Sequence, residues 1–324
     1  MTRSPVPATE LVPESPDPEG LPVLDTAPGH LIRCAQQVHG SLWQQHVPVN
    51  LTSVQYGILL VVGQQPGIDQ RTVGELMSLD KSTAADVLLR LGRRGLLDRE
   101  RDVEDGRRKL VRLTEQGRAA LLAGAPAVVG IQERLLQPLP FDDGETLLGV
   151  LRLVAYRGDP PSPSAATEHN AVVQGWPLRL PAVRLHTAPG HLIRRAQQVH
   201  NTLWGERVSS DLTSVQYNVL LVLHHEARID QRTLGERGSL DKSNGADVIA
   251  RLETRGLVAR IRDTADGRRN LLTLSAEGRD QLLRHAAAVV DVQHELLRPL
   301  SSPQRQVFLR LMKQICEPIS RPAP

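Results

Sequence analysis

Two Asp-Gly-Arg-Arg runs, one with Arg107 and Arg108 and the other with Arg268 and Arg269, carry the clearest binding chemistry in this sequence. Asp-Gly between two short strand-like segments predicts a β-hairpin turn. A hairpin tip that carries guanidinium groups suits the minor groove of duplex DNA, where negative potential attracts arginine. The alternative is an ordinary solvated turn.

Polar residues also begin a helical segment upstream of each hairpin. Lys81, Ser82 and Thr83 stand at the start of the first of these segments, residues 80–93. A helix fits the major groove of B-DNA, and its first exposed polar residues meet base edges and phosphates. The lysine would contact phosphate, and the hydroxyl groups would contact bases or phosphates. The alternative is that these hydroxyl groups only cap the helix.

The corresponding segment further along the chain differs at an informative position. Asn244 stands where the first segment has threonine, and asparagine can pair bidentately with adenine. The two helices would therefore read different half-sites. In each hairpin, one arginine could instead pair with Asp102 or Asp263 and hold the turn. The predicted DNA contacts are Lys81, Ser82, Thr83, Arg107, Arg108, Lys242, Ser243, Asn244, Arg268 and Arg269.

Histidine, arginine and aromatic residues recur at helical spacing in two other segments. His39 and Trp43 are four positions apart and therefore share a helix face. An arginine or histidine there could pair with the carboxylate of a small effector, and nearby tyrosines could line the same pocket. The alternative is interface packing with cations that reach solvent. The candidate effector-binding residues are His30, Arg33, His39, Trp43, Tyr56, His191, Arg194, His200, Trp204 and Tyr217.

The sequence does not favour catalysis or metal binding. It has no His-x-x-x-His or Cys-x-x-Cys motif, so we expect no metal ion and no cofactor. No nucleophile–base pair or phosphate loop stands out, which argues against an enzyme. Two cysteines, Cys34 and Cys316, exclude a disulfide framework and fit a reducing compartment. A redox-sensing Cys34 is one alternative, but a buried thiol is favoured, and Arg195 occupies the corresponding later position.

These residues require a helix-turn-helix followed by a hairpin, and the sequence predicts both. Apolar spacing, capping residues and turn glycines define the elements. The predicted elements are a helix over Leu31–Leu42, helices capped by Thr52 and Asp69, a helix over 80–93 ended by Gly95, strands Leu96–Arg101 and Lys109–Leu113, a helix from Thr114 to before Pro138, and a helix over 142–155. The fold class is mainly α with small β-hairpin wings (α+β), a winged helix-turn-helix.

The whole pattern occurs twice. The run that begins at Thr26 returns at Thr187, and the same offset of 161 residues relates the other motifs. About half of the positions are identical between the two copies. Solenoid repeats run roughly 20–50 residues, so this period marks a duplicated domain. The predicted organisation is a disordered tail over 1–25, winged-helix domains over 26–156 and 185–318, and a Pro-rich linker over 157–184.

Composition sets broad limits on the class of protein. The net charge of +3 and the pI near 9.1 give weak support for nucleic-acid binding. The N-terminus lacks a signal-peptide pattern, and no uncharged apolar run approaches the roughly 18 residues of a membrane span. We therefore expect a soluble cytoplasmic protein without a membrane partner.

With these motifs the chain resembles the MarR family, the multiple-antibiotic-resistance-type regulators. The matching motifs are Ser78-Leu79-Asp80-Lys81-Ser82, Arg94-Gly95-Leu96, Asp105-Gly106-Arg107-Arg108 and Gly117-Arg118, which have close counterparts in the second copy. The family implies homodimers that read a pseudo-palindrome, and small anionic or aromatic ligands that release DNA. The fusion would replace the homodimer by an intramolecular pseudo-dimer, a functional monomer whose interface is built from the first, fifth and sixth helices of each copy.

The sequence therefore predicts a double-stranded DNA-binding transcription regulator. We expect a ligand-responsive repressor that binds a near-palindromic operator with half-sites about one helical turn apart. The first-helix run from Gly190 to Ala196 resembles the branch of the family that governs aromatic-acid catabolism, which implies an aromatic or other organic acid as effector. The alternatives are a winged-helix protein-interaction module without DNA binding, a regulator that senses redox state through Cys34, and an assembly of two chains.

Overall fold

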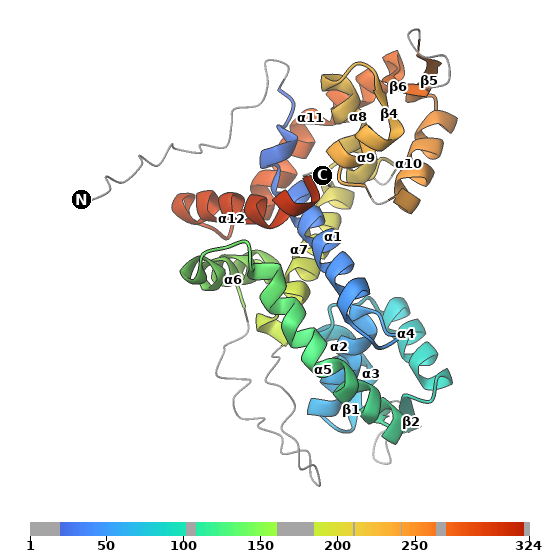
Figure 1. Ribbon diagram of the computed structural model, residues 1–324, viewed down its shortest axis with the longest axis vertical. Coiled ribbons are helices and arrows are strands. Elements are labelled where there is room, and N and C mark those ends of the chain that lie inside the picture. Colours follow the sequence, from blue (N-terminus) through green and yellow to red (C-terminus); the bar gives the residue numbers. More distant parts are fainter. Residues whose placement is uncertain are drawn as a thin grey trace, which may run out of the picture. The chain divides into compact units, whose positions relative to one another are not determined.

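The two halves of the chain, here called copy 1 (26–155) and copy 2 (187–320), contain the same series of elements. The computed structural model describes residues 20–101, 108–160, 185–209, 211–240, 242–263 and 270–320 (Figure 1). Most of the predicted tail over 1–25 and linker over 157–184 lies outside these residues. Copy 1 contains α1 (Pro28–His46), α2 (Ser53–Gln64), β1 (Ile68–Asp69), α3 (Gln70–Leu76), α4 (Lys81–Arg93), β2 (Leu97–Arg101), β3 (Lys109–Leu113), α5 (Glu115–Leu136) and α6 (Phe141–Ala155). Copy 2 contains α7 (Pro189–Arg207), α8 (Ser214–His225), β4 (Ile229–Asp230), α9 (Gln231–Arg237), α10 (Lys242–Thr254), β5 (Val258–Arg262), β6 (Asn270–Leu274), α11 (Ala276–Leu296) and α12 (Ser302–Ser320).

The helices begin at the capping residues that the sequence indicates. Thr52 and Gln55 form a reciprocal capping box at the start of α2, with bonds of 3.2 and 3.0 Å. The Asp69 carboxylate accepts hydrogen bonds from two backbone amides at the start of α3. Thr114 caps α5, and Gly95 takes a φ of 68° just beyond α4. These observations confirm the predicted helix-turn-helix.

A two-residue strand that the sequence analysis did not predict completes each wing sheet. β1 pairs antiparallel with β3, so that the sheet has the order β1-β3-β2, and Ile68 lies opposite Val111. The second copy has the equivalent order β4-β6-β5. Ile68 and Val111 are both buried, so this short strand joins the start of α3 to the hairpin. Two residues are too few to show the alternating pattern that identifies a strand.

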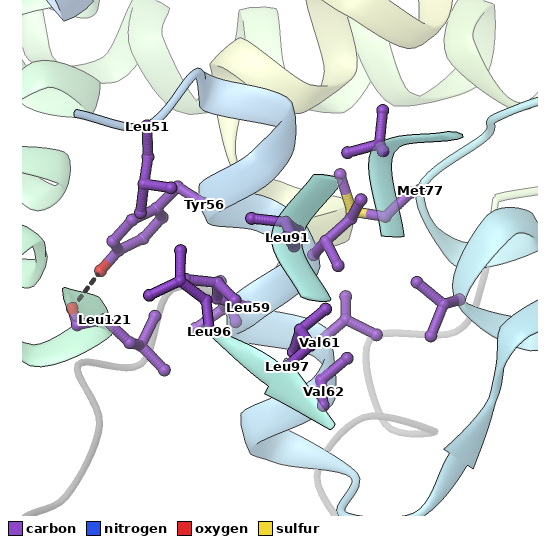
Figure 2. Close-up of a cluster of buried hydrophobic side chains, with 14 of the residues drawn as sticks. Leu51, Tyr56, Leu59, Val61, Val62, Met77, Leu91, Leu96, Leu97 and Leu121 are labelled. Atoms are coloured by element: carbon purple, nitrogen blue, oxygen red, sulfur yellow. Dashed lines mark hydrogen bonds between the residues drawn. The ribbon is translucent and has the colours of Figure 1, made fainter. Parts of the chain in front are cut away.

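The core of copy 1 packs the inner face of α4 against α2, α5 and the sheet. Leu59, Leu88 and Leu91 are fully buried in this cluster. Figure 2 shows Tyr56 in the same cluster, with its hydroxyl donating to the Leu121 carbonyl at 2.8 Å. Burial of each such leucine stabilises the fold by roughly 1.5–3 kcal/mol. The core therefore fixes which face of α4 is left exposed.

Among the described helices, α5 is the one that is long and apolar enough to span a membrane by length and composition. Its uncharged run is bounded by Arg118 and Glu133, so the expectation that no uncharged run approaches roughly 18 residues stands. Leu121, Val128 and Ile131 on α5 are buried inside the winged-helix core. A core helix meets the same criterion, so the finding is weak support for a membrane span.

Contacts divide the chain into two compact units whose boundaries fall within α1 and α7. The copy-1 unit comprises His39–Pro138 with Pro160–Arg195, and the copy-2 unit comprises Met1–Val38, Leu139–Asp159 and Ala196–Pro324. Each unit therefore combines the helix-turn-helix and wing of one copy with the first half of the first helix from the other copy. In the copy-2 unit, α6 also packs along α12 (Figure 1).

Candidate nucleic-acid interface and effector pockets

The polar residues predicted to contact DNA stand exposed at the start of α4. Lys81, Ser82 and Thr83 are all exposed. Both hydroxyl groups donate to the Asp80 carboxylate at 2.5 Å, and Thr83 N donates to it at 2.9 Å. Hydrogen bonds from Ser82 and then from Thr83 hold the pKa of Asp80 well below its usual range.

Capping does not prevent these side chains from contacting bases. A hydroxyl group that donates to Asp80 still has lone pairs that can accept from a base amino group. The cap therefore orients both oxygens at the exposed end of the helix. Lys242, Ser243 and Asn244 begin α10 in the same way, but their side chains lie outside the described part of the chain.

The first wing is joined to α3 by an ion pair. Arg108 is exposed, and its Nη2 atom lies 3.2 Å from Oδ2 of Asp69, the residue that caps α3. Asp69 is therefore one partner of this arginine. Arg107, Arg268, Arg269 and the alternative partner Asp102 lie outside the described residues. The pair positions the base of the wing beside the helix-turn-helix.

A cavity of about 50 Å³ in the copy-1 unit brings together half of the predicted effector residues. We call it the copy-1 pocket. Its lining includes His39 and Trp43 of α1, Tyr56 of α2, and His191 and Arg194 of α7. The sequence named these residue types but could not show that one pocket draws on both copies.

The remaining predicted effector residues lie in the copy-2 unit. His30, Arg33, His200 and Trp204 line a cavity of about 10 Å³, here called the copy-2 pocket. The Tyr217 ring lies behind Trp204, with a centroid separation of 5.6 Å. The structure thus separates the ten candidates into two equivalent sets of five.

The aromatic residues form walls rather than hydrogen-bonding groups. Trp43 Nε1 donates to the Leu51 carbonyl at 2.7 Å, and Trp204 Nε1 donates to Leu212 O at 2.6 Å. The Tyr56 hydroxyl is likewise bonded to Leu121. Their polar ends are therefore occupied within the domain core, and their rings face neighbouring aromatic and apolar side chains.

The arginine of each pocket binds the C-terminal end of the helix that precedes α4 or α10. Arg194 Nη2 donates to Met77 O after α3, and Arg33 donates to Gly238 O at 2.6 Å and to Ser239 O after α9. Carbonyl groups at a helix C-terminus lack helical partners and carry partial negative charge. An arginine from one copy therefore holds the turn that leads into α4 or α10 of the other copy.

Buried imidazole groups supply the other polar atoms of the pockets. His39 Nδ1, His191 Nε2 and His200 Nε2 have no hydrogen-bond partner among the described atoms. Burial and nearby arginine charge lower the pKa of His39 to about 4, that of His191 to about 3 and that of His200 to about 4. Neutral imidazole can donate to or accept from a ligand hydroxyl group.

We expect the free energy of unfolding to fall as the pH is lowered from about 6.5 to about 4. The three buried imidazoles have native pKa values below the unfolded value of 6.5, so the unfolded state binds more protons in this window. Each contributes a slope of about 1.4 kcal/mol per pH unit. Urea unfolding of His200→Gln should show a smaller slope of free energy against pH than the parent protein. A pH-independent midpoint would contradict this assignment.

The two cysteines meet in the copy-2 unit. Cys34 and Cys316 are both buried, which confirms the buried thiol that the sequence favoured. A hydrogen bond from Cys316 lowers the pKa of Cys34, and the Cys34 sulfur lies 2.9 Å from the Ser239 hydroxyl. The sequence did not indicate this pairing, because the residues stand near opposite ends of the chain.

Comparison with known proteins identifies relatives of both copies. The family model described as MarR family matches residues 49–108 and 210–269. The transcriptional regulator HosA of Escherichia coli is 34% identical over 123 residues, which are 38% of this chain and 90% of HosA. The HTH-type transcriptional repressor NicR of Pseudomonas putida is 31% identical over 125 residues, which are 38% of this chain and 79% of NicR.

Solved structures of similar chains belong to regulators of the same kind. The PcaV transcriptional regulator from Streptomyces coelicolor, in complex with its natural ligand, is 44% identical, with a TM-score of 0.41, and the match covers 42% of this chain and 97% of PcaV. A MarR mutant from Escherichia coli complexed with operator DNA is 27% identical, with a TM-score of 0.34, over 36% of this chain and 84% of that chain. The sequence relationship to HosA and the two matches to the family model show that this chain belongs to the MarR family of transcriptional regulators, with the DNA-binding domain present twice.

Proposed function

We propose that this protein is a sequence-specific repressor that binds a near-palindromic operator as a single-chain pseudo-dimer. The observation that carries the proposal is that each copy supplies an arginine to the other. Arg194 of copy 2 donates to Met77 O of copy 1, and Arg33 of copy 1 donates to Ser239 O of copy 2. The turn before each recognition helix, α4 or α10, is thereby held by the other copy. The exposed Lys81 and the polar cap of α4 supply the DNA-reading end of the helix, which would enter one major groove.

The proposed effector is a small aromatic or other organic acid. Its carboxylate would bind the pocket arginine, and its ring would lie against the tryptophan and tyrosine walls. A ring hydroxyl group would bond to a neutral imidazole, such as His39 or His191. A carboxylate on Arg194 competes with Met77 O, because a pair of two charged groups that can bond at two points is stronger than one bond from arginine to a neutral carbonyl. The turn before α4 would then be released, and DNA affinity would fall.

Footprinting on the intergenic region upstream of the gene tests this function. The full chain should protect two half-sites about one helical turn apart, and excess unrelated duplex should not remove the protection. A panel of hydroxylated benzoates should weaken the complex. The absence of a specific footprint would contradict the proposal and favour the protein-interaction module, whose binding does not require DNA.

The buried thiol pair favours a second candidate function, regulation by oxidation. Cys34 hydrogen-bonds with Cys316, and its sulfur lies 3.3 Å from His30 Nε2 in the copy-2 pocket. Oxidation of this thiol would alter the copy-2 pocket, because the sulfur lies beside His30. Loss of a hydroperoxide response in Cys34→Ser, with operator binding intact, would support this candidate. An unchanged response would exclude it.

A further inference from the structure

The two effector pockets differ at positions that a homodimer would keep identical. Both pockets contain the same arginine, histidines and tryptophan, and Gln132 and Gln293 hold equivalent amides, Gly190 N at 3.1 Å and Gly29 N at 2.9 Å. The differing pairs, copy-1 pocket first, are Gly57 and Asn218, Met77 and Gly238, and Arg195 and Cys34. These differences change the groups that lie beside the arginine.

In the copy-2 pocket, the Asn218 side chain occupies the space beside the arginine. In the orientation that satisfies both ends of its amide, the oxygen accepts from Arg33 Nη2 at 3.3 Å and the nitrogen donates to Ser214 O at 3.3 Å. Arg33 also donates to the two carbonyls at the end of α9. The remaining cavity has a volume of about 10 Å³.

In the copy-1 pocket, the apolar side chain of Met77 takes the equivalent place. Gly57 has no side chain, and the Met77 thioether lies against it, because a Cβ at residue 57 would be 2.7 Å from Met77 Cε. Methionine is unbranched and adapts its shape readily. The cavity has a volume of about 50 Å³, compared with about 10 Å³ in the copy-2 pocket. Two buried imidazole nitrogens, His39 Nδ1 and His191 Nε2, lack partners among the described atoms.

We propose that the chain binds one aromatic carboxylate, in the copy-1 pocket, and that the Asn218 amide replaces the ligand carboxylate on Arg33 in the copy-2 pocket. This inference rests on the proposed effector-responsive function and specifies where the effector binds. Arg195 adds a second positive charge near His191, where the copy-2 pocket has Cys34 in place of a cation. The effector should therefore bind with simple hyperbolic saturation, and release of one recognition helix should suffice to weaken the operator complex.

Isothermal titration calorimetry of the full chain with 4-hydroxybenzoate and 3,4-dihydroxybenzoate measures the number of sites. We expect one molecule of at least one probe per chain. Arg194→Ala should weaken binding at least tenfold, whereas Arg33→Ala should change the affinity less than threefold. Thermal unfolding of both variants checks that each is folded.

Exchange of the small and large residues between pockets gives a matched test. The pair Asn218→Gly with Gly238→Met reproduces the copy-1 pocket in copy 2 and should raise the stoichiometry to two. The pair Gly57→Asn with Met77→Gly reproduces the copy-2 pocket in copy 1 and should abolish binding of the probe.

The outcomes separate this inference from the proposed function. Two probe molecules per unmodified chain, or equal losses in Arg33→Ala and Arg194→Ala, would overturn the single-site inference while leaving DNA regulation intact. No binding of either probe, with operator binding preserved, would overturn the assigned ligand class and with it the inference. One bound probe without any operator binding would support the inference and contradict the proposed function.

Discussion

Alanine at both Arg107 and Arg268 should weaken operator binding about a hundredfold and leave the fold intact. Each arginine belongs to an Asp-Gly-Arg-Arg run at a predicted wing tip. Loss of such a contact costs roughly 1–3 kcal/mol, and the losses should add because the wings are separate sites. Fluorescence anisotropy at fixed salt measures the affinity. The slope of log affinity against log salt should also fall by about two if both arginines contact phosphate.

The control for this prediction removes the same charge elsewhere. Arg134 on α5 and Arg284 on α11 are exposed, and the Arg134→Ala, Arg284→Ala double variant should bind the operator nearly as well as the parent. Each single wing variant should lose about tenfold. If the wing double variant matched this control, the hairpins would be ordinary solvated turns.

Alanine at Gly29 or Gly190 should destabilise the protein by roughly 1–3 kcal/mol, the usual cost of overpacking. A Cβ at Gly29 would lie 2.2 Å from His200 Nε2, and one at Gly190 would lie 2.2 Å from His39 Nε2. Both imidazole rings are almost fully buried, so neither can move aside cheaply. Each contact joins residues of different copies. The loss of unfolding free energy therefore measures how tightly the first helix of one copy packs on the first helix of the other. Urea unfolding provides the free energy.

Gly40 in the same helix provides the matched control, because a Cβ there meets nothing within 4 Å. Gly40→Ala should stabilise α1 by up to about 1 kcal/mol. His200→Ala should partly relieve the effect of Gly29→Ala, which a double-mutant cycle detects as coupling. Equal effects of Gly29→Ala and Gly40→Ala, without coupling to His200, would contradict the packing of one copy's first helix on the other copy.

Most of the fold follows from local signals in the sequence. Thr52, Asp69 and Thr114 identify helix starts because each accepts backbone hydrogen bonds that the helix leaves unpaired. Gly95 identifies a helix end because its φ is positive. The strand over Ile68–Asp69 escaped detection because its pairing with β3 is a tertiary contact without a local pattern.

The composition of the pockets was predictable, but their grouping was not. His39 and Trp43 share a face of one helix, which periodicity reveals, whereas their approach to His191 and Arg194 depends on how the copies pair. The carbonyls that bind Arg33 and Arg194 carry no sequence signal, because every residue has a carbonyl. Asn218 was missed, although its difference from Gly57 is visible when the copies are aligned.

The mass of the operator complex tests the central claim most directly. Light scattering on the purified complex, with a duplex of known mass, counts the protein chains that bind one operator. A single-chain pseudo-dimer predicts one chain of 35.6 kDa per duplex, with both half-sites protected. Two chains per duplex, each protecting one half-site, would contradict it.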